Sequence, residues 1–61
     1  MAAAATEVIQ TTNLPAAVVL LVERGFWRVR RSSLEWMSDD KWARIERLPS
    51  GKVNIKIGVQ G

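Results

Sequence analysis

Residues 42–58 read Trp42-Ala-Arg-Ile-Glu-Arg-Leu-Pro-Ser-Gly-Lys-Val-Asn-Ile-Lys-Ile-Gly58, and this stretch predicts a β-hairpin. Pro49 presets φ for a type I turn, and Gly51 can take the left-handed conformation that closes a three-residue loop with a bulge. That closure fixes the register of the two arms. The expected pairs are Leu48 with Lys52, Arg47 with Val53, Glu46 with Asn54, Ile45 with Ile55, Arg44 with Lys56 and Ala43 with Ile57.

Alternation along the two arms separates an apolar face from a basic face. The apolar face collects Ala43, Ile45, Val53, Ile55 and Ile57, with Arg47 near the turn. The other face collects Trp42, Arg44, Glu46, Lys52, Asn54 and Lys56. We expect the first face to pack into a core and the second to meet solvent.

A helix is predicted over 14–24, upstream of the hairpin. Asn13 suits the N-cap, Pro15 is harmless in the first turn, and Gly25 supplies the stop. The segment is apolar nearly all round, so a buried strand is the alternative. Its nine largely apolar residues, Leu14 to Val22, are too few to span a bilayer.

The remaining segments give weaker signals. Residues 26–31 alternate well enough for a third strand, but both of its sides carry an aromatic residue. Residues 6–12 fit either a short edge strand or ordered coil, and residues 1–5 are expected to fray. Residues 33–38 fit a helical turn or another hairpin arm. A rival interpretation is one continuous helix over 33–48, with an apolar stripe formed by Leu34, Met37, Trp42, Ile45 and Leu48.

These elements predict one small α+β domain over residues 1–61, with one main helix on a small antiparallel sheet that ends in a C-terminal β-hairpin. The hairpin arms are expected at 42–48 and 52–58. The chain has no Cys and no His, so we expect no disulfide, metal or cofactor. So short a chain buries only about 60% of its unfolded surface, which makes a homo-oligomer a natural remedy. Absence of Cys fits a cytoplasmic location.

The charge pattern points to a polyanionic partner. All nine Lys and Arg residues lie between Arg24 and Lys56, where they outnumber four acids. Arginine pairs with phosphate bidentately, and exposed Trp stacks on bases. The sequence therefore predicts a small regulatory or accessory protein that binds nucleic acid, DNA more than RNA. The expected contacts are Arg28, Arg30, Arg31, Arg44, Lys52 and Lys56, with Trp27 and Trp42 stacking or wedging.

Two other interpretations compete with nucleic-acid binding. The Trp residues could be core and the cations a solvated face, or the chain could be a homodimeric protein-interaction module that uses residues 18–22 or a free edge strand. Catalysis is not expected, nor are a membrane span or a small-molecule substrate. The string Ser38-Asp-Asp-Lys41 matches the Ser-x-x-Lys pattern of penicillin-binding enzymes, but their supporting motifs are absent.

Overall fold

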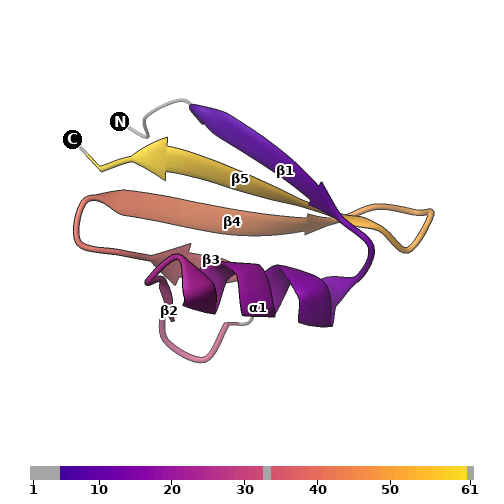
Figure 1. Ribbon diagram of the computed structural model, residues 1–61, viewed down its shortest axis with the longest axis horizontal. Coiled ribbons are helices and arrows are strands. Elements are labelled where there is room, and N and C mark those ends of the chain that lie inside the picture. Colours follow the sequence, from indigo (N-terminus) through magenta and orange to yellow (C-terminus); the bar gives the residue numbers. More distant parts are fainter. Residues whose placement is uncertain (1–4, 33, 61) are drawn as a thin grey trace.

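The computed structural model describes residues 5–32 and 34–60 and has one helix packed on a five-stranded antiparallel sheet (Figure 1). Its elements are β1 (Glu7–Thr11), α1 (Leu14–Glu23), β2 (Trp27–Arg28), β3 (Glu35–Met37), β4 (Lys41–Arg47) and β5 (Val53–Val59). The strand order is β1-β5-β4-β3-β2, so the first strand lies beside the last. The predicted α+β class and C-terminal hairpin are confirmed.

The hairpin has the predicted turn and the predicted register. The Leu48 N–H donates to Lys52 O at 2.9 Å, the Gly51 N–H donates to Leu48 O at 3.0 Å, and Gly51 has a φ of 92°. Every predicted pair from Ala43–Ile57 to Arg47–Val53 is present. The arms differ from the predicted ranges by one residue at each end, because pairing extends to Lys41–Val59 at the open end.

Gly51 provides a test of this turn. A Cβ added there would meet no atom within 4 Å, so a substitution is penalised by backbone conformation alone. We expect Gly51→Val to lower the free energy of unfolding by about 1–2 kcal/mol, because a β-branched residue resists positive φ. Gly51→Asn should cost less, since Asn tolerates this region. Urea unfolding measures both, and equal losses would contradict the left-handed turn.

Helix α1 begins and ends where its caps predict. Asn13 Oδ1 accepts a hydrogen bond from the Ala16 N–H at 2.9 Å, and Gly25 follows the C-cap with a φ of 84°. Ala17 and Leu21 are fully buried, whereas Val19 and Val22 are 56% and 58% exposed. The helix is therefore covered on one side only, although its sequence is apolar nearly all round.

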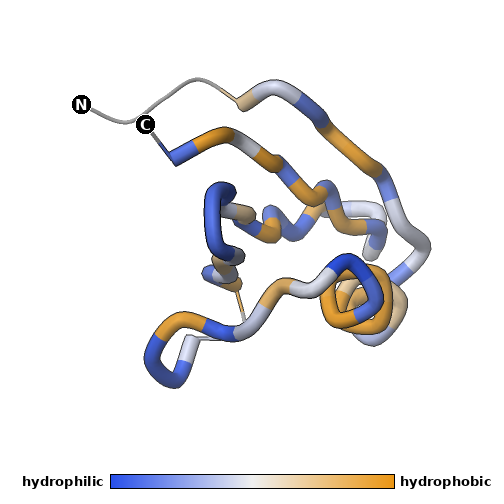
Figure 2. The backbone as a smooth tube through the Cα atoms, turned by 60° about the vertical axis from the view of Figure 1, so that its left-hand side comes forward, coloured by the Kyte–Doolittle hydropathy of each residue, from blue (hydrophilic) through white to orange (hydrophobic). Residues whose placement is uncertain are grey.

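The core lies between α1 and one face of a curved sheet (Figure 2). Phe26 and Trp36 belong to it, which settles the ambiguity of residues 26–31: the side carrying Phe26 faces inward. The buried apolar set is Ala17, Leu21, Phe26, Trp36, Ala43, Ile45, Val53, Ile55 and Ile57. No acidic or basic residue is buried among the described residues.

Other predictions need correction. The rival helix over 33–48 is wrong, because β3 and β4 form a hairpin that the Ser38 N–H closes onto Lys41 O at 2.8 Å. The third strand is shorter than predicted: β2 stops at Arg28, and Arg30 turns the chain with a φ of 58°. Residues 6–12 contain a true edge strand, β1. The predicted frayed end falls on residues 1–4, outside the described residues, and on Ala5.

Candidate functional site

One face of the sheet is left without a covering layer by the described elements, because α1 packs on the other face. We call it the open face. The strand registers and the alternation along each strand determine which residues lie on this face. They are Val8 and Gln10 from β1, Trp27 from β2, Glu35 and Met37 from β3, Trp42, Arg44 and Glu46 from β4, and Asn54, Lys56 and Gly58 from β5.

Large side chains form a row across three neighbouring strands of the open face. Trp27 pairs with Met37, and Met37 pairs with Trp42. Directly opposite residues in an antiparallel sheet lie close enough for their side chains to touch. Trp27 is 48% exposed at the β2 edge, and Met37 and Trp42 are half-buried. We call Trp27, Met37 and Trp42 the Trp row.

The row ends at Gly58, which pairs with Trp42 on β5. A Cβ built on Gly58 would overlap Cε2 and Cζ2 of the Trp42 indole. The missing side chain thus lets the ring lie against the β5 backbone, a close approach that glycine in a strand permits. Gly58 therefore leaves the space that the Trp42 ring occupies at this end of the row.

Charges on the open face are balanced beside the Trp row. Arg44 lies opposite Lys56, as predicted, but Glu35 lies opposite Arg44 on its other side. Lys56 Nζ is 2.9 Å from Glu46 Oε2. Each cation thus has a carboxylate neighbour, and the four formal charges cancel. This weakens the expectation that Arg44 and Lys56 bind the phosphates of a nucleic acid.

The other predicted contacts lie elsewhere. Arg28 pairs with buried Trp36 and so belongs to the helix side of the sheet. Arg30 and Arg31 lie in the connection between β2 and β3, which projects at the lower left of Figure 2. Lys52 belongs to the turn that projects at the right of Figure 1. Within residues 5–32 and 34–60, none of these four cations has an ion-pair partner.

Thus the structure brings Trp27, Trp42, Arg44 and Lys56 together on one face and disperses the remaining predicted contacts. Met37, Gly58 and Glu35 were missed by sequence reasoning. Extending the hairpin register by one pair would have placed Trp42 against Gly58. β3 has only three residues, too few for side-chain alternation to show which strand it pairs with. The positions of Met37 and Glu35 opposite β4 could therefore not be predicted from the sequence.

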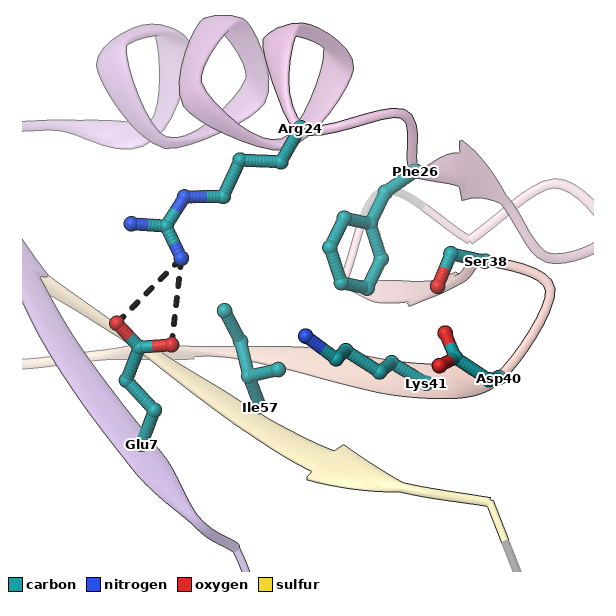
Figure 3. A pocket seen from close by; sticks show the side chains of 7 residues that line it. All are labelled: Glu7, Arg24, Phe26, Ser38, Asp40, Lys41 and Ile57. Atoms are coloured by element: carbon teal, nitrogen blue, oxygen red, sulfur yellow. Dashed lines mark hydrogen bonds and ion pairs between the residues drawn. The ribbon is translucent and has the colours of Figure 1, made fainter.

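A pocket of about 290 Å³ opens on the helix side, where α1 ends (Figure 3). Its lining residues are Glu7, Arg24, Phe26, Ser38, Asp40, Lys41 and Ile57. The four charged side chains cancel formally, and Lys41 extends along the floor beside Ile57. Among the described residues, Ser38 Oγ has no hydrogen bond to an activating base, and no three His, Cys, Asp or Glu side chains cluster for a metal ion.

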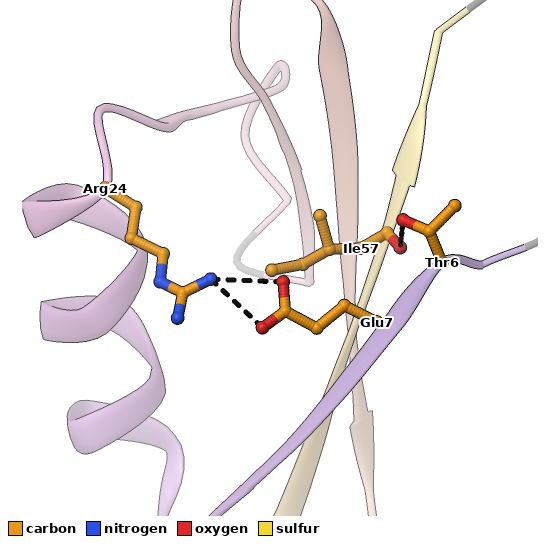
Figure 4. A network of polar contacts seen from close by, with 4 residues as sticks. All are labelled: Thr6, Glu7, Arg24 and Ile57. Atoms are coloured by element: carbon orange, nitrogen blue, oxygen red, sulfur yellow. Dashed lines mark hydrogen bonds and ion pairs between the residues drawn. The ribbon is translucent and has the colours of Figure 1, made fainter.

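One ion pair in this pocket fastens β1 to the end of α1 (Figure 4). Arg24 Nη1 donates to Glu7 Oε1 at 3.2 Å and to Oε2 at 3.4 Å. Thr6 Oγ1 donates to Ile57 O at 3.2 Å, which ties the start of β1 to β5. Both partners of the ion pair are nearly half-exposed, so its contribution is small. The contact orients the side chains of Arg24 and Glu7 toward each other.

Comparisons with protein families, with curated proteins and with solved structures found no match. No helix in the described ranges combines the length and the apolar character needed to cross a membrane. Only the residues of the open face themselves therefore indicate what this face could bind.

Proposed function

We propose that the protein binds single-stranded nucleic acid on the open face, with bases stacked along the Trp row and phosphates held by Arg30 and Arg31. The observation that carries this proposal is the placement of Trp27, Met37 and Trp42 in one cross-strand row on the face that α1 leaves uncovered. A cytoplasmic location and a regulatory or accessory role belong to the same proposal.

The geometry favours single strands over duplexes. Neighbouring strands lie about 4.8 Å apart, so the backbones of Trp27 and Trp42, which are two strands apart, are separated by about 10 Å across the sheet. Splayed bases can stack on such flat aromatic surfaces, and each stacked base contributes about 1–3 kcal/mol. The bases of a duplex already stack on one another and present edges and phosphates instead. The balanced charges of the open face offer little to a duplex backbone.

We assign the phosphate contacts to Arg30 and Arg31, because they follow β2, the strand that carries Trp27. Arg30 adopts positive φ, which a non-glycine residue rarely does. Backbone strain of this kind is often retained at functional sites. Arginine forks bind phosphate oxygens in pairs, so a strand leaving the Trp row at the β2 edge would meet suitable donors.

The test is a fluorescence-anisotropy titration with 12-nucleotide DNA and RNA single strands and a 12-base-pair duplex. We expect tighter binding of the single strands, and the DNA arm tests the predicted preference for DNA. Trp27→Ala should weaken binding about 5- to 150-fold, in line with the loss of one stacked base. Val19→Ala, at a similarly exposed site on α1, is the matched control and should bind like the wild type.

Salt dependence tests the arginines separately. Two phosphate contacts to a single strand give a slope of log K against log salt of about −1.4. Arg30→Gln with Arg31→Gln removes both contacts and should therefore reduce the magnitude of this slope by about 1.4. Arg47→Gln with Lys52→Gln removes the same charge elsewhere and should change the slope less. Undetectable binding of every oligonucleotide at low salt, or binding unchanged by Trp27→Ala, would refute the assignment in favour of a protein partner.

A further inference from the structure

The two edges of the sheet differ in how they are protected from pairing with another strand. At one edge, β2 has two residues and runs into the Arg30 turn, so little backbone is available there. At the other edge, β1 has five residues, Glu-Val-Ile-Gln-Thr, and pairs with β5 on one side only. In natural proteins, pairing of an edge strand with another chain is commonly prevented by a short strand, by charged side chains, especially Lys, by Pro or by a bulge. β1 contains no Lys and no Pro.

The side chains of β1 also leave its outer edge accessible. Its one charged residue, Glu7, is turned toward α1 and held by Arg24. Gln10 Nε2 donates to Asn54 Oδ1 at 3.4 Å, so this side chain inclines toward β5. Val8 is 58% exposed on the open face. In an antiparallel strand, alternate N–H and C=O groups point away from the existing partner and remain available for a second one.

We infer that β1 is a self-association edge, at which a second copy of the chain pairs antiparallel through its own β1. The two sheets would then form one continuous sheet of ten strands around a two-fold axis, with both helices on the same side. A second copy of the chain fits this edge best, because β1 can pair with its own sequence and because so small a domain gains most from added burial. This inference goes beyond the proposed function and does not depend on it.

The symmetry restricts the register. A two-fold axis normal to the sheet pairs residues that share a face, so the residue on the axis meets its own copy. Centring on Ile9 pairs all five residues of β1, which no other centre does. Ile9 then meets Ile9 on the helix side, Val8 meets Gln10 on the open face, and Glu7 meets Thr11. No like charges are placed opposite each other, and the two Glu7 carboxylates stay apart.

The absence of Cys makes this register directly testable. Directly opposed Cα atoms in an antiparallel pair are about 4.5–5.5 Å apart, which a disulfide can bridge, whereas diagonal neighbours are about 7–8 Å apart. Under mild oxidation, a mixture of the Val8→Cys and Gln10→Cys proteins should therefore crosslink as a heterodimer. Either variant alone should crosslink at least tenfold less. Both positions are exposed, so both variants should fold.

The control is Val22→Cys, equally exposed on the outer side of α1. It should remain uncrosslinked, and crosslinking there without the mixed product would place the interface on the helix and overturn the inference. Sedimentation without nucleic acid gives the second measurement. The wild type should self-associate weakly, as expected of a small interface, and Val8→Lys with Gln10→Lys should raise the dimer Kd at least tenfold. A monomeric wild type at millimolar protein would also overturn it.

Discussion

Replacing Leu21 with alanine should lower the free energy of unfolding by about 3 kcal/mol, the largest loss expected from any single change considered. Leu21 is fully buried and lies in the core between α1 and the sheet. Removing three carbons there loses hydrophobic transfer energy and leaves a cavity. The core of so small a domain rarely supplies more than about 3–5 kcal/mol, so most of the stability would disappear.

The neighbouring residue provides the control for Leu21. Val22 also lies on α1 but is 58% exposed, so Val22→Ala should change stability by less than about 0.5 kcal/mol. Thermal and urea unfolding, followed by circular dichroism, measure both variants. Similar losses in the two variants would show that the helix is not seated on the sheet through Leu21.

The second large effect is expected at Gly58. Gly58→Ala should destabilise the fold by about 2 kcal/mol, because its Cβ would overlap the Trp42 indole and force the ring away from β5. The near-ultraviolet circular dichroism of the tryptophans should change at the same time. Binding of single strands should weaken as well, since Trp42 leaves the Trp row.

A double-mutant cycle identifies the cause of the Gly58 effect. In a Trp42→Ala background the overlap is gone, so Gly58→Ala should be close to neutral. The coupling free energy between the two positions should then be about 1–2 kcal/mol. An equal cost in both backgrounds would mean that Gly58 is required by its backbone conformation and not by the ring.

The hairpin and the helix could be predicted because their signals are local. Pro49 and Gly51 define the turn, and alternation carries the register outward from it. Asn13 and Gly25 mark the helix limits in the same way. These residues act through bonds and contacts a few positions away, which a single sequence displays directly.

The remainder of the fold depends on contacts that are distant in sequence. β1 is a strand because β5 pairs with it, and residues 6–12 alone fit coil equally well. β3 has three residues, too few for alternation to fix its partner. For the candidate site, both Trp residues were predicted as contacts, but the side of the sheet that carries Trp27 was not, and neither was the position of Glu35 opposite Arg44.

The placement of β1 beside β5 has a consequence for the topology of the chain. Thr6 and Ile57 are 51 positions apart in sequence, so this strand pair closes nearly the whole chain into a loop. Strands β2 to β5 instead form a meander of neighbours, as Figure 1 shows. Loop-closure entropy is therefore concentrated in a single step, the docking of β1. In a circular permutant that joined β5 to β1, the same pair would become a local hairpin. Every two strands that are adjacent in the sheet would then also be consecutive along the chain.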